Sequence, residues 1–289
     1  MVGFLDEQPS WSKSSVHKMI RSLREGKTYD KALFNDFMMQ HALLVQALEP
    51  IIDDTFGSFT LIEAGDGEEI APNSGRYRLS SRTKIFRTTV EKIRRMRTTP
   101  IYRIQDIAGC RVDFDGTHTI QDSMATRLEE AMERSGADKV KILDLRSNPH
   151  SGYRAVHLHV DFPAGKIEIQ LRTALQAQWA NLYEVAADIF GRQIRYDDWS
   201  AGLDQGEQTI VTALHGISDG IYDFERFRQS VQGRHREENK QGNLATPVQE
   251  INDQAEQLYG RIDDMLNVFR EIRDRMRSTP AENKSREAR

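Results

Sequence analysis

The sequence predicts an α/β (α+β) protein in which helices flank a mixed β-sheet and a long pair of helices ends the chain. Strand and helix patterns alternate through the middle of the chain, between about residues 60 and 180. Two alternating segments, 153–160 and 166–172, flank a turn with Pro163 and Gly165, as in a β-hairpin. Beyond residue 200, apolar residues recur three and four positions apart, which is typical of long packed helices.

Length and composition narrow the class of protein. The chain has 289 residues, of which 38% are hydrophobic, and a net charge of −4, which argues against wholesale electrostatic binding to nucleic acid. The single cysteine, Cys110, excludes a disulfide framework and a thiolate metal cluster. We find no signal peptide and no apolar segment of membrane-spanning length, so we expect a cytoplasmic protein without a membrane partner.

The first 57 residues are expected to form helices that pack on the core. A short amphipathic helix is predicted over residues 11–26, where Gly26 ends it. A longer helix is predicted over residues 29–54, because apolar side chains recur there at helical spacing. A strand is expected at residues 59–62, where a central domain spanning residues 58–195 begins.

The charge then changes sign, with nine basic residues and one acid between residues 76 and 97. In a helix over residues 83–97, Phe86, Val90 and Ile93 would face the core, and Lys84 and Lys92 would lie on another side. Such a run is either a solvated basic face or a surface that holds an anion, because clustered cations repel one another unless an anion lies among them.

The central domain continues with further strands and helices. A buried strand is predicted over residues 104–114, beginning just after Asp106. A helix over residues 120–134 and a strand over residues 140–145 lead to the hairpin, and a helix over residues 173–190 follows it. One face of the second hairpin strand is polar and includes Glu168, so this face is either solvent-exposed sheet or the floor of a polar site. In the first case, Glu168 would pair with Lys166 or Arg172.

The remaining residues, 196–277, predict a helical hairpin. The apolar stripe of its first helix includes Ile210, and a polar loop is expected from Gly233 to Pro247. Its second helix carries a coiled-coil seam between Val248 and Met276. The seam would fold onto its own domain, pair with a second copy or receive another protein, and the sequence leaves these alternatives open. Residues 278–289 form a polar tail that we expect to be flexible.

Two carboxylates and a basic segment indicate the chemistry. Asp106 and Glu168 lie on strands that can converge on one face, and one or two carboxylates with phosphate oxygens are a minimal Mg²⁺ site. Basic side chains nearby would hold a polyphosphate and neutralise charge in phosphoryl transfer. The chain has no Walker A loop and no Gly-x-Gly-x-x-Gly motif. The residues therefore predict Mg²⁺-dependent chemistry on a nucleoside triphosphate, on a scaffold other than a P-loop or kinase fold.

Between about residues 76 and 190 the sequence resembles the synthetase domain of the RelA/SpoT family. The resemblance depends on four motifs in a fixed order: Arg82-Thr83-Lys84 with Lys92, Asp106 to Arg111, Asn148 to His157, and Glu168 to Thr173 followed by Trp179-Ala180. It implies a nucleotidyltransferase-like mixed sheet. It also implies transfer of the β,γ-pyrophosphate of ATP to a 3′-hydroxyl, usually of GDP or GTP, which makes (p)ppGpp alarmones.

The resemblance also implies a role for each matching residue. Arg82, Lys84 and Lys92 would bind ATP, Asp106 would hold Mg²⁺, and Glu168 would help to position the metal and deprotonate or orient the acceptor hydroxyl. Arg111 would contact the nucleotide or be a buried partner of Asp106. In the acceptor pocket, Tyr153 would stack on the base beside His157 and Gln170. His150 is also expected on the acceptor side. His159 and His150 could both be simple polar surface, since two histidines without a third ligand are weak evidence for zinc.

The sequence departs from the family in the acceptor half. Many members carry lysine and asparagine just before Gly152-Tyr153, whereas this chain has the shorter His150-Ser151, and Leu143 stands near the place of another basic residue, for which Arg146 would substitute. The acceptor therefore stays open between GDP or GTP and, as in toxic small relatives of toxin–antitoxin pairs, the 3′-CCA end of tRNA or an adenosine nucleotide. For a tRNA acceptor, a track for the nucleic-acid backbone could be supplied by Arg76, Arg78, Arg87, Arg94 and Arg95. Such a toxin could bind its antitoxin through the C-terminal helices. A non-catalytic RNA-binding protein with the same fold is a further alternative.

Overall fold

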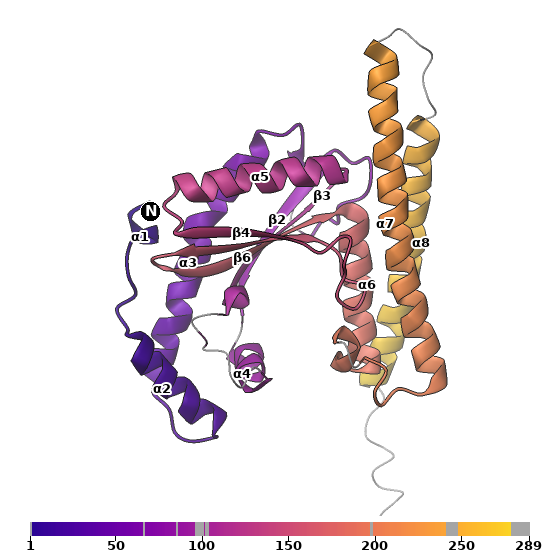
Figure 1. The fold of residues 1–289 in the computed structure, drawn as a ribbon. Helices are drawn as coiled ribbons and strands as arrows, with labels where there is room; N and C mark the ends of the chain where they lie inside the picture. Colours follow the sequence, from indigo (N-terminus) through magenta and orange to yellow (C-terminus); the bar gives the residue numbers. More distant parts are fainter. Residues whose placement is uncertain are drawn as a thin grey trace, which may run out of the picture.

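A computed structural model describes residues 2–65, 67–84, 86–95, 101, 104–196, 199–240 and 248–278. Within them, six strands form one mixed sheet in the order β1-β2-β3-β6-β5-β4 (Figure 1). The strands are β1 (Ile62–Glu63), β2 (Arg76–Thr83), β3 (Ala108–Phe114), β4 (Lys139–Asp144), β5 (Val156–Phe162) and β6 (Gly165–Thr173). β3 and β6 run parallel, as do β1 and β2, whereas β2 runs antiparallel to β3 and β5 runs antiparallel to both β4 and β6. This confirms the predicted mixed sheet and the hairpin, and adds β2, a strand where we had predicted only a basic segment.

Helices α3 (Lys31–Gly57) and α5 (His118–Arg134) cover the apolar face of the sheet, where α5 lies above the strands in Figure 1. The apolar residues of β6 point into this layer, because Ile167, Ile169 and Leu171 are fully buried. They pack with Leu48 of α3 and Leu128 of α5. The opposite side chains of β6 therefore form the other face of the sheet, as the alternation predicts.

A second, smaller core lies toward the other side of the sheet. Here α2 (Lys13–Arg24) and α4 (Phe86–Arg95) pack together, and Ile93 of α4 is fully buried among residues of α2 and α3. Val90 is buried in the same cluster, as predicted, whereas the side chain of Phe86 lies outside the described residues. The short helix α1 (Val2–Leu5), which the sequence did not predict, adds Leu5 to the main core.

The three last helices form a third core at the end of the sheet: α6 (Ala174–Phe190), α7 (Gln205–Lys240) and α8 (Val248–Ser278) (Figure 1). α8 lies along α6 as well as α7, and Gln178 of α6 donates to Asp263 of α8 at 2.7 Å. The seam is buried at Ile251, Ala255 and Ile262, whereas its C-terminal end is exposed at Ile272 and Met276.

Two details of the C-terminal prediction are wrong. α7 runs on to Lys240, so the loop that we expected from residue 233 begins later. Its buried stripe uses Val211, whereas Ile210 is 41% exposed. Apart from Ser278, which ends α8, the predicted tail lies outside the described residues. The division of the chain into separate domains stays a prediction. No described helix combines the length and hydropathy needed to cross a membrane.

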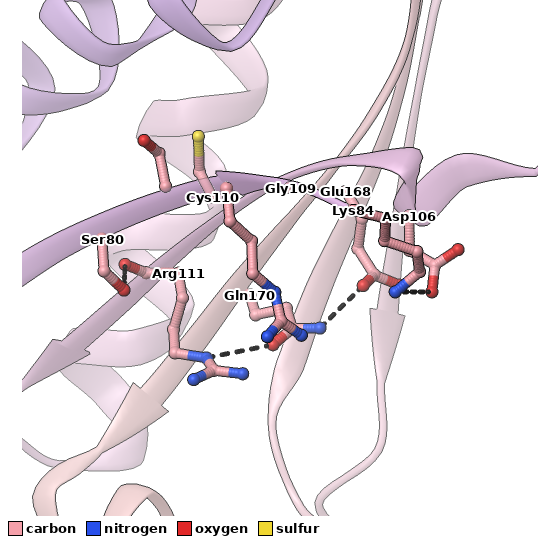
Figure 2. Close-up of a pocket in the computed structure, with 10 residues that line it drawn as sticks. Ser80, Lys84, Asp106, Gly109, Cys110, Arg111, Glu168 and Gln170 are labelled. Carbon is pink, nitrogen blue, oxygen red and sulfur yellow. Dashed lines mark hydrogen bonds and ion pairs between the residues drawn. The ribbon is translucent and has the colours of Figure 1, made fainter. Parts of the chain in front are cut away.

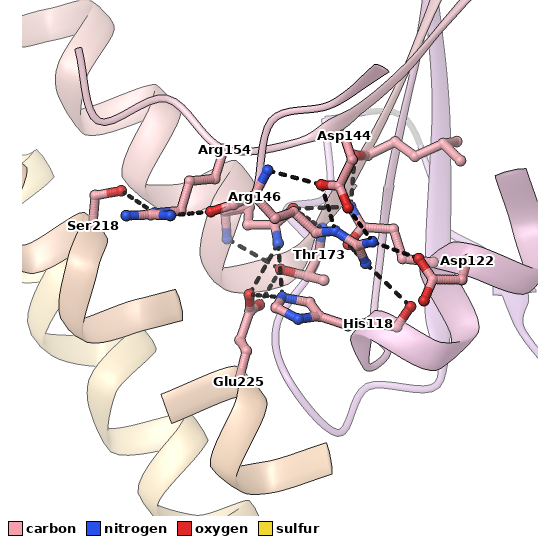
Figure 3. A network of polar contacts seen from close by, with 11 residues as sticks. His118, Asp122, Asp144, Arg146, Arg154, Thr173, Ser218 and Glu225 are labelled. Atoms are coloured by element: carbon pink, nitrogen blue, oxygen red, sulfur yellow. Dashed lines mark hydrogen bonds and ion pairs between the residues drawn. The ribbon is translucent and has the colours of Figure 1, made fainter. Parts of the chain in front are cut away.

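A buried polar network joins α7 to the end of β6 (Figure 3). Glu225 of α7 accepts hydrogen bonds from the hydroxyl of Thr173, from Nε2 of Gln176 at 2.9 Å, and is 2.8 Å from Nε2 of His118. Thr173 is the last residue of β6 and the N-cap of α6, where its hydroxyl accepts from the backbone N–H of Gln176. The network therefore fixes the junction between the sheet and the C-terminal helices.

Candidate active site

The polar face of the sheet contains a cavity of about 130 Å³ (Figure 2). Antiparallel and parallel registers align residues across the strands, so that Arg82, Gly109, Glu168 and His159 form one row. The cavity lining comes from β2, β3, β6 and the turn before β3: Ser80, Ser81, Arg82, Lys84, Asp106, Gly109, Cys110, Arg111, Glu168 and Gln170. The two predicted carboxylates thus lie in one cavity with three of the cations expected to bind ATP.

Asp106 lies at the mouth of this cavity, in a 3-10 turn (Gln105–Ile107) just before β3. Nζ of Lys84 is 3.1 Å from Oδ2 of Asp106, and Nζ of Lys92 contacts Oδ1. The Asp106 side chain is 25% exposed and both lysine side chains are 18% exposed, so the cluster is open to solvent. The alternative in which Arg111 is the partner of Asp106 is not found, because both lysines take that place.

Glu168 is the more buried of the two acids, and its side chain is 14% exposed. Oε1 lies 3.1 Å from Nε2 of His159 and 3.3 Å from Nδ1 of His157, and Oε2 accepts from Nε2 of Gln170 at 2.7 Å. Burial by itself would raise the pKa of Glu168, but the hydrogen bonds from the two histidines and Gln170 outweigh it and hold this pKa far below its ordinary value. Glu168 is therefore ionised at neutral pH.

The two pairings that would have made Glu168 an ordinary surface residue are absent. Lys166 pairs with Asp161, and Arg172 forms a bidentate ion pair with Asp113 at 2.7 and 2.8 Å. Asp113 and Arg172 are 1% and 2% exposed, so this pair is part of the buried frame of the sheet. Sequence reasoning missed it, although both residues lie on alternating strands at positions that the register brings opposite one another.

Tyr153, His157 and Gln170 are brought together, as predicted. The Tyr153 hydroxyl donates to Oε1 of Gln170 at 3.4 Å and lies 3.1 Å from Nε2 of His157. Burial raises the pKa of Tyr153 to about 12, although the positive charges of Arg172 and Arg111 oppose this effect. A phenol held neutral in this way remains a hydrogen-bond donor to Gln170, which lines the cavity, whereas Tyr153 and His157 are not themselves among the lining residues.

Arg111 lies on the floor of the cavity, where Nε donates to Oε1 of Gln170 at 3.4 Å (Figure 2). Burial lowers its pKa, and the like charge of Arg172 adds to the effect. Arg82, near the C-terminal end of β2, is exposed on the same polar face of the sheet as Arg111. Arg111 thus forms no ion pair with Asp106 among the described residues, and its contact with a nucleotide stays a prediction.

The other two residues expected on the acceptor side, Arg146 and His150, are not among the residues that line the cavity. Arg146 lies beside α5 and α7, where Nη2 pairs with Asp122 at 2.5 Å and with Asp144 at 2.7 Å (Figure 3). These two acids neutralise Arg146 within a separate cavity of about 350 Å³ that also includes Arg226 of α7.

His150 begins a tight turn that ends at Tyr153, whose N–H donates to the His150 carbonyl at 2.9 Å. Ser151 (φ 48°) and Gly152 (φ 79°) both have positive φ, as in a type I′ turn. A Cβ on Gly152 would lie 2.8 Å from Cζ2 of Trp179, so only glycine fits there. The short loop noted in the sequence is thus a closed turn that packs on α6 and positions Tyr153.

Comparison with known proteins agrees with the fold and the motifs. A family model described as a region found in RelA/SpoT proteins matches residues 81–190. Uncharacterized proteins of Mycobacterium bovis and Mycobacterium tuberculosis are 37% identical over 196 residues, which are 67% of this chain and 65% of theirs. The aligned region thus spans less than two thirds of these relatives. The small alarmone synthetase 1 of Bacillus subtilis has a similar fold, with a TM-score of 0.53 at 19% identity over 71% of this chain and 98% of that one.

Proposed function

Because this chain contains a RelA/SpoT-family synthetase domain over residues 81–190, we propose that it is a Mg²⁺-dependent ATP:nucleotide 3′-pyrophosphotransferase. The donor is ATP, and the acceptor is the 3′-hydroxyl of a guanosine nucleotide, GDP or GTP, which gives an alarmone of the (p)ppGpp type. The observation that carries the proposal is the cavity in which Asp106 and Glu168 lie together with Arg82, Lys84 and Arg111.

The cation cluster supports ATP as the donor. Lys84 and Lys92 neutralise Asp106 in the absence of ligand, and both side chains are near solvent. A triphosphate that enters the cavity brings its own negative charge, so the two ammonium groups can bind phosphate oxygens while still close to Asp106. Arg82 and Arg111 add two guanidinium groups on the same face of the sheet.

Asp106 and Glu168 fit Mg²⁺ because they are oxygen donors at one cavity, and Mg²⁺ needs only one or two protein carboxylates beside phosphate oxygens and water. Asp106 is better placed than Glu168 to bind Mg²⁺, because its ion-pair partners are the ammonium groups of Lys84 and Lys92, which lie near solvent and can turn away to phosphate oxygens. When bound, Mg²⁺ would neutralise charge on the transferred phosphates.

Glu168 is assigned to the acceptor. In the transfer, the 3′-oxygen bonds to the β-phosphorus of ATP, the bond from that phosphorus to the α–β bridging oxygen breaks, and AMP leaves. An ionised carboxylate with a low pKa is a good hydrogen-bond acceptor and a weak base. Glu168 therefore orients the 3′-hydroxyl, and the proton of this hydroxyl passes to solvent water as the new bond forms. Gln170 and Tyr153 lie beside it, where they would contact the acceptor nucleoside.

The experiment uses purified full-length protein, Mg²⁺ and ATP labelled at the γ-phosphate, with GDP, GTP, AMP or deacylated tRNA offered separately. A parallel reaction with ATP labelled at the α-phosphate must release AMP, because release of ADP would indicate a phosphokinase instead. We expect label on a guanosine nucleotide, and loss of transfer in Asp106→Asn and in Glu168→Gln. Label on no acceptor, with folded protein, would refute the enzymatic function and favour the non-catalytic RNA-binding alternative.

A second acceptor, the 3′ end of tRNA, is favoured by one observation. Arg146 is neutralised by Asp122 and Asp144, and none of the residues 144–153 is among those that line the cavity. Among the described residues, the stretch 144–153 thus offers no free cation in the cavity to the 5′-diphosphate or triphosphate of an acceptor, whereas a terminal adenosine carries none of these charges. Arg76 and Arg78, which we had considered for a tRNA track, are paired with Glu68 and Asp113 respectively. Label on tRNA alone would establish this alternative, with an antitoxin as the expected partner.

A further inference from the structure

Two histidines lie against Glu168. His157 and His159 are on β5, two residues apart and on the same face, and the hairpin register places His159 directly opposite Glu168. Nδ1 of His157, Nε2 of His159 and a carboxylate oxygen of Glu168 all lie within 4.8 Å of one another. The third ligand that the sequence lacked is therefore supplied by the neighbouring strand.

We propose that His157, His159 and Glu168 bind a transition-metal ion of the Zn²⁺ class, and that this ion inhibits pyrophosphate transfer by occupying Glu168. The inhibitory half of the proposal rests on the proposed function. Two imidazoles and one carboxylate, with a position left for water, are a known type of Zn²⁺ site. Mg²⁺ and Ca²⁺ prefer oxygen ligands, so the same three groups select against them.

The distances suit such an ion. Ligands of tetrahedral Zn²⁺ lie about 2.0–2.1 Å from the metal, which places them about 3.3–3.4 Å from one another. Oε1 of Glu168 lies 3.1 Å from Nε2 of His159 and 3.3 Å from Nδ1 of His157. Small side-chain rotations are thus enough to place an ion among the three atoms. His159 is 25% exposed, which leaves an approach from solvent.

The surrounding hydrogen bonds also favour a cation. The Tyr153 hydroxyl donates to Gln170, so the oxygen of Tyr153 is free to accept from Nε2–H of His157. In the neutral imidazole protonated at Nε2, Nδ1 offers a lone pair beside the Glu168 carboxylate, so a metal ion there can take the place of the proton of the hydrogen bond. Tyr153 and Gln170 would serve as the outer groups that orient metal ligands, as is usual around such sites.

The two sides of Glu168 then differ in the ion that they prefer, with the cavity that contains Asp106 on one side and the two histidines on the other. Asp106 offers oxygen atoms beside lysines, whereas the histidine end offers nitrogen atoms, and Glu168 belongs to both. An ion held by the histidines withdraws the Glu168 oxygen that would otherwise orient the 3′-hydroxyl. Zinc excess would therefore lower transfer while Mg²⁺ and ATP are still present.

Binding is tested first, without substrates, on full-length protein stripped of metals. Co²⁺ is the spectroscopic probe, and Zn²⁺ is added as its competitor. We expect one Co²⁺ per chain with the visible spectrum of a tetrahedral site, displaced by Zn²⁺, and an affinity at least about tenfold lower in His159→Gln. Asp106→Asn should bind Co²⁺ as wild type does. His17→Gln is the control, because His17 is an exposed histidine on α2; its Co²⁺ affinity should be unchanged.

Transfer is then measured with Mg²⁺ in excess and free Zn²⁺ at ten times its Kd. The wild-type rate should fall about tenfold relative to its own zinc-free rate and recover with a zinc-selective chelator. The His159→Gln rate should keep about half or more of its own zinc-free value, because a site that binds at least about tenfold more weakly is at most about half occupied. This comparison controls for Zn²⁺ bound to ATP. Equal Co²⁺ binding by wild type and His159→Gln overturns the proposal, as does Zn²⁺ binding without loss of rate. Failure of transfer without zinc refutes the proposed function instead, and the Co²⁺ measurement then decides the metal site alone.

Discussion

Replacing Glu225 with alanine should destabilise the whole protein, because this side chain on α7 joins the C-terminal helices to the catalytic sheet. Glu225 is 4% exposed and faces donors on Thr173, Gln176 and His118. His118 also borders the cavity beside α7, so water can replace its lost partner. The donors of Thr173 and Gln176 are left buried, and each unsatisfied group costs about 1–3 kcal/mol. We therefore expect a loss of about 2–5 kcal/mol in the free energy of unfolding.

Thermal unfolding monitored by circular dichroism measures the effect. For a domain of this size about 1 kcal/mol corresponds to about 2–4 °C, so the Tm of Glu225→Ala should fall by about 5–15 °C. Glu225→Gln keeps one acceptor oxygen and should fall less. Asp223→Ala removes an exposed carboxylate from the same helix and should stay within about 0.5 kcal/mol of wild type. Equal Tm values for Glu225→Ala and Asp223→Ala would refute the network as the link between α7 and β6.

Two further substitutions test the turn and the buried ion pair. Gly152→Ala should lower the free energy of unfolding by about 2 kcal/mol or more, because Gly152 has positive φ and an added Cβ would contact Trp179. The control is Gly216→Ala, which lies in open space on α7 and should raise the free energy of unfolding by up to about 1 kcal/mol. Equal denaturation midpoints for the two variants would contradict this prediction. Asp113→Asn should cost about 3–5 kcal/mol at pH 7. Burial raises the pKa of Asp113, but Arg172 outweighs this and lowers it, so the stabilisation is present above the unfolded pKa of about 3.9 and is lost as pH falls through the lower folded pKa. The deficit of Asp113→Asn should therefore shrink in unfolding experiments below about pH 4, and a constant deficit would contradict the assigned charge.

The helices and the hairpin were predictable because the spacing of their apolar residues matches only one type of secondary structure in each case. In β6, Ile167, Ile169 and Leu171 alternate with polar residues, and all three are fully buried. β2 was missed because its polar positions, among them Arg78 and Arg82, resemble a basic surface run. The side chains of Arg78 and Arg82 point to the face of the sheet that carries the site. The basic residues that made β2 hard to predict are therefore residues that β2 positions at this face.

The pairing of His159 with Glu168 was also within reach of the sequence. Phe162 pairs with Gly165, so the turn of the hairpin consists of Pro163 and Ala164. A two-residue turn fixes the register of a hairpin, and counting back from it places residues 159 and 168 opposite one another. We had placed the turn between residues 160 and 166, which left the register open. The position of Arg146, in contrast, depends on Asp122 of α5, and no local pattern encodes that packing.

Burial separates the permanent ion pairs of this face from those that a ligand can exchange. Asp113 and Arg172 are almost fully buried, so separating them would leave charges without water, and their pair is structural. Asp106 is 25% exposed, and its lysines can turn to phosphate oxygens at little cost because solvent already reaches them. Glu168 lies between these limits, with histidine partners that can rotate away or retain a metal ion. The chemistry is therefore expected at Asp106 and Glu168, on a floor that the pair of Asp113 and Arg172 keeps rigid.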